Sequence, residues 1–196
     1  MIKYGLCSVL IIILLMFSGC SDDKRIDKAL LAESVSVSVD KQNFEYTFYM
    51  IGSEDKVKSV SIKANSFSQA YFRAKEKYIP NLSLAKLELF IFDEKISYDK
   101  LKSDVEYVAH SDSISPLAMI TLADGKAIKY VNETKEAPEH IKQLIFQIKK
   151  KLPKLRNNIL SIFNNFNRRT SEIFCVPYIN SDKELNVDFR IFSSNK

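Results

Sequence analysis

The sequence predicts a single α+β domain in which helices pack against a mixed β-sheet, and three observations lead to this class. Apolar and polar residues alternate with a period of two over 34–39, 44–51, 57–64 and again over 185–192, as in half-buried strands. Between these regions, several stretches place apolar residues three or four positions apart, as on one face of a helix. Strands at both ends of the domain, with helices and strands interleaved between them, favour a mixed sheet.

The domain is expected to begin with three strands. Residues 34–39 read S-V-S-V-S-V, which is the alternation of a half-buried strand. Residues 40–43 supply a turn and residues 44–51 alternate again, so these two strands are predicted to form a hairpin. Residues 52–55 interrupt the pattern, and residues 57–64 are the third predicted strand.

A helix is expected directly after the third strand. Ser66 and Gln69 fit a capping box, in which each side chain satisfies a free backbone amide at the helix start. Pro80 and Asn81 end the helix. Its apolar face is formed by Phe67, Ala70, Tyr71, Ala74 and Tyr78.

The central part of the chain is expected to supply two strands with a helix between them. Residues 84–92 are nearly all apolar, which is typical of a strand covered on both faces. A helix over 98–109 and a strand over 117–122 follow. The Asp-Gly pair at 124–125 predicts a turn, and the pattern of residues 126–131 is ambiguous.

The last part is expected to form two helices and then two strands. Pro138 suits the first turn of a helix, which Pro153 should kink or end. A further helix is predicted over 159–166, and strands over 173–179 and 185–192. The apolar stripe of the helix after Pro138 is formed by Ile141, Leu144, Ile145, Ile148, Leu152 and Leu155.

The first twenty residues form a secretory signal segment. Lys3 gives a positive start, residues 6–17 are almost continuously apolar, and small residues precede Cys20. We therefore predict a lipoprotein signal peptide over 1–19, a lipidated Cys20 with a tether over 20–33, and an α+β domain over 34–196. The apolar run is shorter than the roughly 20 residues of a spanning helix. An uncleaved anchor that stops at the charges after Cys20 is the alternative.

Lipidation would place the protein on the extracytoplasmic face of a membrane. Cys20 would carry a diacylglycerol and an N-acyl chain, and more than one acyl chain gives stable anchoring. No other cofactor is expected. Cys175 would then have no disulfide partner, and its apolar neighbours predict a buried, inert thiol.

A basic stretch lies in the second half of the domain. Residues 135–169 carry nine basic and two acidic residues. Such a face could rest on anionic headgroups or a partner, and the alternative is a solvated helix face. Nucleic acid is not an expected partner of an exported chain without a binding motif. The candidate contact residues are Lys142, Lys149, Lys150, Lys151, Lys154 and Arg156.

The chain offers no set of residues that indicates an enzyme. His110 and His140 lie on different predicted elements, so no cluster of metal ligands is expected. Ser97 and Lys100 match S-x-x-K, but no companion motif of a serine acyl-transfer enzyme accompanies them. We therefore predict a protein without catalytic or metal-binding residues.

Several segments, taken in order, resemble the N-terminal domain of the Ger(x)C family, the lipoprotein C-subunits of spore germinant receptors. Cys20-Ser21-Asp22 corresponds to the family's lipobox cysteine and the residues after it. Residues 64–70 match a helix start of the type A-x-S-F-x-x-A, and residues 85–94 match a strand of the type H-L-K-V-L-V-I-G-E. The strand from Pro116, which ends before Asp124-Gly125, also fits.

The resemblance implies a non-enzymatic accessory subunit. Such a protein would sit on the outer face of the spore inner membrane with two integral membrane subunits and take part in the response to nutrient germinants. Two other functions remain open from the sequence. One is a cell-envelope lipoprotein that binds a solute or a wall component, and the other is an envelope enzyme.

Overall fold

The computed structural model describes residues 29–41, 43–51, 57–167, 173–181 and 185–193. None of the helices in these ranges is long and apolar enough to cross a bilayer. The elements are, in order, β1 (Leu30–Asp40), β2 (Asn43–Ile51), β3 (Val57–Lys63), α2 (Phe67–Lys77), β4 (Leu82–Ser83), β5 (Leu89–Asp93), α3 (Tyr98–Ala109), β6 (Met119–Ala123), α4 (Gly125–Glu133), α5 (Ala137–Lys151), α6 (Ile159–Phe166), β7 (Ile173–Asn180) and β8 (Asn186–Ser193).

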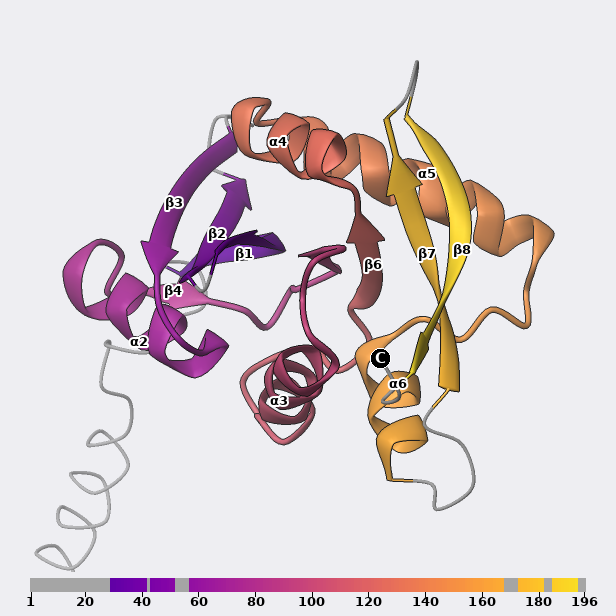
Figure 1. Ribbon diagram of the computed structural model, residues 1–196. Helices are drawn as coiled ribbons and strands as arrows, with labels where there is room; N and C mark the ends of the chain where they lie inside the picture. Colours follow the sequence, from indigo (N-terminus) through magenta and orange to yellow (C-terminus); the bar gives the residue numbers. More distant parts are fainter. Residues whose placement is uncertain (1–28, 42, 52–56, 168–172, 182–184, 194–196) are drawn as a thin grey trace, which may run out of the picture.

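One mixed β-sheet organises the domain, which confirms the α+β class (Figure 1). Its strand order is β3-β2-β1-β5-β6-β7-β8, and the short β4 pairs with the start of β1. The four central strands β1, β5, β6 and β7 are parallel. Antiparallel hairpin partners extend the sheet at both edges, β2 and β3 on one side and β8 on the other.

Helices cover both faces of the parallel centre. Every residue of β5 is buried, and successive side chains of a strand point to opposite faces. Phe90 and Phe92 belong to the larger apolar core, which also contains residues of α2, α3 and α6. Leu89 and Ile91 belong to a smaller core beneath α4 and α5. The sheet is therefore the middle of three layers.

Side-chain caps explain where α2 and α3 begin. Ser66 Oγ accepts a hydrogen bond from the Gln69 amide at 3.2 Å, and Gln69 Oε1 accepts from the Asn65 amide at 3.0 Å. Ser97 caps α3 in the same way, since its Oγ accepts from the Lys100 amide at 3.3 Å. The S-x-x-K match is thus a helix cap, and the predicted helix over 98–109 is confirmed.

The strand predicted over 84–92 is wrong in its first half. Leu84 and Leu87 are buried, but a turn joins them, in which the Leu87 amide donates to the Leu84 carbonyl at 3.0 Å. The strand β5 begins only at Leu89. A buried turn and a buried strand are both rich in apolar residues, so an apolar run in the sequence does not distinguish them. The first strand likewise starts at Leu30, within the segment assigned to the tether.

The turn predicted at 124–125 is the start of helix α4. Asp124 Oδ1 accepts from the Ala127 amide at 2.6 Å, so this residue is an N-cap. Its other oxygen accepts from the Ser181 amide at 3.1 Å, which joins the ends of β6 and β7. The ambiguous segment 126–131 is helical because Ala127, Ile128 and Val131 pack into the smaller core.

Candidate functional site

The predicted lipidation site, Cys20, lies outside the described residues. Its acylation therefore remains a prediction. The described chain starts at residue 29 and enters β1 at Leu30.

The predicted basic contact surface lies on and after helix α5. Pro138 occupies the first turn of this helix, as predicted. The fully buried side chains all belong to its first nine residues, and Ile141 and Ile145 reach the smaller core. The apolar stripe is shorter than predicted, since Leu152 is 48% exposed. The helix ends at Lys151, two residues before Pro153.

Lys142 differs from the other five candidate basic residues because two carboxylates hold it. Its Nζ lies 2.7 Å from Glu88 Oε2 and 2.5 Å from Glu139 Oε2, and only 21% of its side chain is exposed. Partial burial by itself lowers the pKa of Lys142, but the bonds to Glu139 and Glu88 outweigh this and raise it overall. The lysine therefore joins α5 to the start of β5 rather than offering a free charge.

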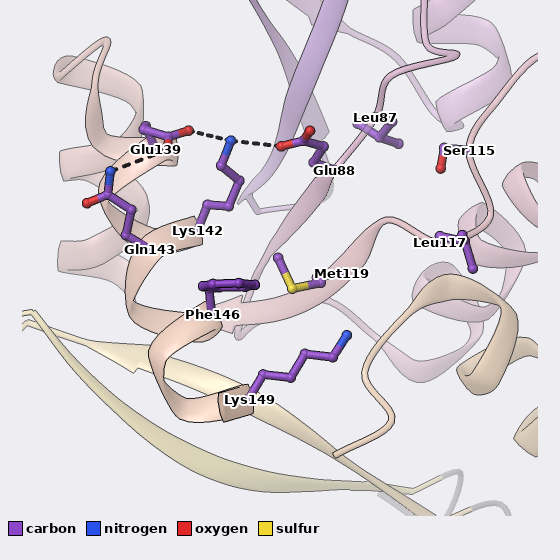
Figure 2. A pocket seen from close by; sticks show the side chains of 10 residues that line it. All are labelled: Leu87, Glu88, Ser115, Leu117, Met119, Glu139, Lys142, Gln143, Phe146 and Lys149. Atoms are coloured by element: carbon purple, nitrogen blue, oxygen red, sulfur yellow. Dashed lines mark hydrogen bonds and ion pairs between the residues drawn. The ribbon is translucent and has the colours of Figure 1, made fainter. Parts of the chain in front are cut away.

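A hollow of about 510 Å³ lies beside this bridge, between α5 and the beginnings of β5 and β6. Figure 2 shows Lys142 between its two carboxylates on one side, with Phe146 and Met119 close to each other below. Lys149 extends along the other side. The wall is mainly apolar and is formed by Leu87, Leu117, Met119 and Phe146.

The remaining basic residues are not neutralised within the described part of the chain. Lys149, Lys150, Lys151, Lys154 and Arg156 form no ion pair with any residue that the structure describes. The ammonium group of Lys150 instead lies over the Phe146 ring, 4.9 Å from its centre. Phe146 is 53% exposed and Leu117 is 65% exposed. Apolar and positively charged side chains therefore share one surface.

The two histidines lie on the surface. His110 follows the last turn of α3 and makes an edge contact with Phe163, while His140 lies within hydrogen-bond distance of the Tyr130 hydroxyl. Both are exposed and they belong to different helices. Across the described ranges, no group of histidine, cysteine and carboxylate side chains could hold a metal ion.

The prediction of a buried Cys175 is wrong, because the residue is exposed. In β7, Phe174 and Val176 point into the larger core, so Cys175 points to the opposite face. There it lies opposite Ile191, which is also exposed. Partial burial of the sulfur nevertheless raises the pKa of the Cys175 thiol, which lowers its reactive thiolate fraction.

Asp104 is a buried charged residue that the sequence analysis does not single out. Asp104 is almost fully buried and accepts bonds from the Tyr46 hydroxyl at 2.8 Å, the Phe67 amide at 3.1 Å and Lys100 Nζ at 2.5 Å. Burial raises the pKa of Asp104, and Lys100 opposes this effect. The group joins β2, α2 and α3. The only sequence signal was the i, i+4 spacing of Lys100 and Asp104.

Comparison with known families gives one match over most of the chain. The family described as the spore germination protein N-terminal domain matches residues 22–181, from just after Cys20 to the end of β7. No curated protein and no solved structure matches the chain. The family match confirms the resemblance to the N-terminal domain of the Ger(x)C proteins and connects the chain with spore germination. This chain belongs to the spore germination protein N-terminal domain family.

Proposed function

We propose that this protein is a lipid-anchored, non-enzymatic accessory subunit of a nutrient-germinant receptor in spores. One observation carries the proposal: the family match begins at residue 22, two positions after the predicted lipidation site Cys20. The germination domain is therefore joined to the predicted lipid anchor without an intervening domain. A germination protein held in this way would act at a membrane.

The anchor would keep the domain close to the bilayer. Acyl chains contribute about 0.8 kcal/mol per buried CH₂, and two or more chains give stable attachment. Residues 20–29 span at most about 35 Å when fully extended. Surfaces of the domain would thus stay within reach of headgroups and of membrane-embedded receptor subunits.

The environments of the polar side chains support a non-catalytic role. Ser97, which was considered because of its S-x-x-K spacing with Lys100, caps a helix. Asp104, whose pKa is raised by burial, lies within the packed core and is joined to its neighbours by three bonds. These groups stabilise the fold, because each is bonded to a structural partner. A catalytic group would instead need access to a substrate.

The decisive experiment replaces Cys20 with alanine in sporulating cells. We expect the variant to lose incorporated labelled fatty acid and its spores to respond poorly to nutrients, while a non-nutrient trigger still works. Cys7→Ala is the matched control, because Cys7 lies within the predicted signal peptide and should leave both readouts unchanged. Normal nutrient germination in spores that lack the protein would refute the receptor role.

A second candidate function is a cell-envelope lipoprotein that binds a small solute, and the hollow beside α5 favours it. Its volume of about 510 Å³ lies in the range of ligand sites, and its wall is mainly apolar. A bound solute would raise the melting temperature of the wild type but not of a Met119→Lys variant. Absence of any such shift across amino acids, sugars and wall fragments would exclude this function.

A further inference from the structure

We propose that the end of α5 and the loop after it contact an anionic lipid surface. We call this region the basic–apolar surface and define it by Leu117, Lys149, Lys150, Lys151, Leu152, Lys154 and Arg156 together with Phe146. The inference deepens the proposed function, since a domain tethered at Cys20 would already lie near a bilayer. It names the lipid headgroups as a second point of contact.

The charge of this surface is concentrated, and no carboxylate in the described ranges pairs with it. Residues 149–156 include five cations, and no acidic residue occurs between Glu139 and Glu172. In the described part of the chain, none of the five cations pairs with a carboxylate, whereas Lys142 pairs with two. Each lysine or arginine near an anionic bilayer strengthens binding about fivefold. The pattern therefore favours an anionic partner outside the chain.

The apolar side chains at the same place indicate lipid. Phe146, Leu117 and Leu152 are each about half exposed or more, at 53%, 65% and 48%. Single exposed apolar residues are ordinary, but these stand among the cations just described. Lys150 lies against the Phe146 ring, and Lys149 lines the same hollow as Leu117. Apolar side chains flanked by lysine are typical of helices that lie in the headgroup region.

The kind of cation favours lipid over an acidic protein. Four of the five are lysines, and only Arg156 has the planar fork that suits fixed carboxylates. Lysine is depleted in protein–protein interfaces, where arginine and tyrosine are enriched. Lysine is a mobile point charge on a flexible stem, so it can follow headgroups that have no fixed positions.

The rest of α5 would hold this surface in place. Ile141 and Ile145 pack into the smaller core, and Lys142 joins the helix to Glu88. The first part of the helix is thus packed and bonded, while Phe146, Lys150 and Lys151 toward its end are exposed. In Figure 2, Lys149 and Phe146 lie beyond the bridge that Lys142 makes, toward the end of the helix.

A tryptophan reporter tests the contact, because the chain contains no tryptophan. The full chain would be made in a bacterial host with Phe146→Trp and, separately, with Phe72→Trp. Phe72 is also exposed, but it lies on α2, which covers the opposite face of the sheet from α5. Each protein is bound to vesicles of brominated phosphatidylglycerol or brominated phosphatidylcholine, and quenching of the fluorescence is measured.

We expect strong quenching at position 146 in phosphatidylglycerol, weaker quenching there in phosphatidylcholine, and little at position 72 in either lipid. Replacing Lys149, Lys150 and Lys151 with glutamine should weaken the contact about a hundredfold, at about fivefold per lysine. The control replaces Lys58, Lys63 and Lys77, which are exposed outside the basic–apolar surface, with glutamine. It removes the same amount of charge and should leave the lipid contact unchanged. Higher salt should weaken the contact by screening.

Equal quenching at both positions, or none at position 146, would overturn the inference. It would also fail if the Phe146→Trp protein showed no quenching while spores with the triple lysine variant kept their labelled fatty acid and lost nutrient germination, because the surface would then contact a protein. Labelled fatty acid on Cys20 is measured in the same samples. If fatty acid is present without quenching, only the proposed lipid contact of α5 is refuted. If quenching occurs without fatty acid, only the proposed anchor at Cys20 is refuted.

Discussion

The two ends of helix α5 have the same kinds of residues but opposite environments. In the first half, Ile141 and Ile145 are buried and Lys142 is bonded to Glu88 and Glu139. In the second half, Phe146 is exposed and Lys149 to Lys151 have no carboxylate partner among the described residues. Apolar and basic side chains thus stabilise the fold in the first half of α5. In the second half, side chains of the same kinds remain available to contact a partner.

This difference arises from what lies opposite each end. The first half packs over the parallel strands, where Leu89 and Ile91 supply an apolar surface and Glu88 supplies a charge. In the second half, Phe146, Lys150 and Lys151 are exposed, and no side chain belongs to the smaller core. A lysine or a phenylalanine therefore cannot be assigned a role from its place on the helix alone.

The largest expected effect is a difference in unfolding free energy between substitutions at the two ends of α5. Ile145→Ala should lower the free energy of unfolding by about 2–5 kcal/mol, because it leaves a cavity in the smaller core. Leu152→Ala should change it by less than about 0.5 kcal/mol, since that side chain is half exposed. Urea unfolding with an unchanged m-value measures both. Equal losses would show that the second half is packed as firmly as the first.

The next effect compares two lysines of the same helix. Lys142→Met should cost about 1 kcal/mol, because two partly exposed pairs of about 0.2–1 kcal/mol each are lost. Lys150→Met is the matched control and should stay within about 0.5 kcal/mol. A double-mutant cycle with Glu88→Gln isolates the long-range pair. A coupling of zero would mean that Lys142 is as free as Lys150.

Alkaline pH should remove the difference in unfolding free energy between the wild type and the Lys142→Met variant. The bonds to Glu139 and Glu88 raise the pKa of Lys142 despite the opposing effect of burial. The stabilisation is therefore complete below the unfolded value of about 10.4 and is lost as pH rises through the folded pKa. Burial also raises the pKa of Tyr178, to about 12, so both proteins become less stable in alkali. A difference that persisted unchanged at high pH would contradict the ion-pair origin.

The smallest effect concerns the charges at the open end. Lys151→Gln should cost about 0.3 kcal/mol, because a cation in the last turn interacts with the helix dipole. The loss should disappear in high salt, where exposed charges are screened. Thermal unfolding at low and high salt measures it. A larger, salt-resistant loss would indicate a partner for Lys151 that the described residues do not show.

Local patterns were read from the sequence with good accuracy. The helix over 98–109 has the predicted bounds, and the Ser66 cap forms as expected. These features depend on neighbours within a few positions. The sequence predicts a turn at Asp124, because an Asp-Gly pair occurs both in turns and at helix starts. The segment is helical because Ile128 and Val131 pack into the smaller core.

The candidate surface was only partly predictable. The run of cations over 149–156 is visible in the sequence, but Lys142 was grouped with them because Glu88 lies 54 positions away. Phe146 was not singled out, since its exposure depends on the tertiary packing of α5 and not on its neighbours in the sequence. Cys175 was assigned to the core because its neighbours are apolar, although alternate strand residues face opposite ways.

The sequence by itself determined the basic run and the kind of most elements, because periodicity, composition and short motifs depend on neighbouring residues. Only the tertiary structure decided that β1, β5, β6 and β7 lie parallel at the centre and that helices cover both faces. It also decided which lysine is paired and which ring is exposed. Such pairings join residues far apart in the chain, so they depend on how the crossovers fold and not on any local pattern.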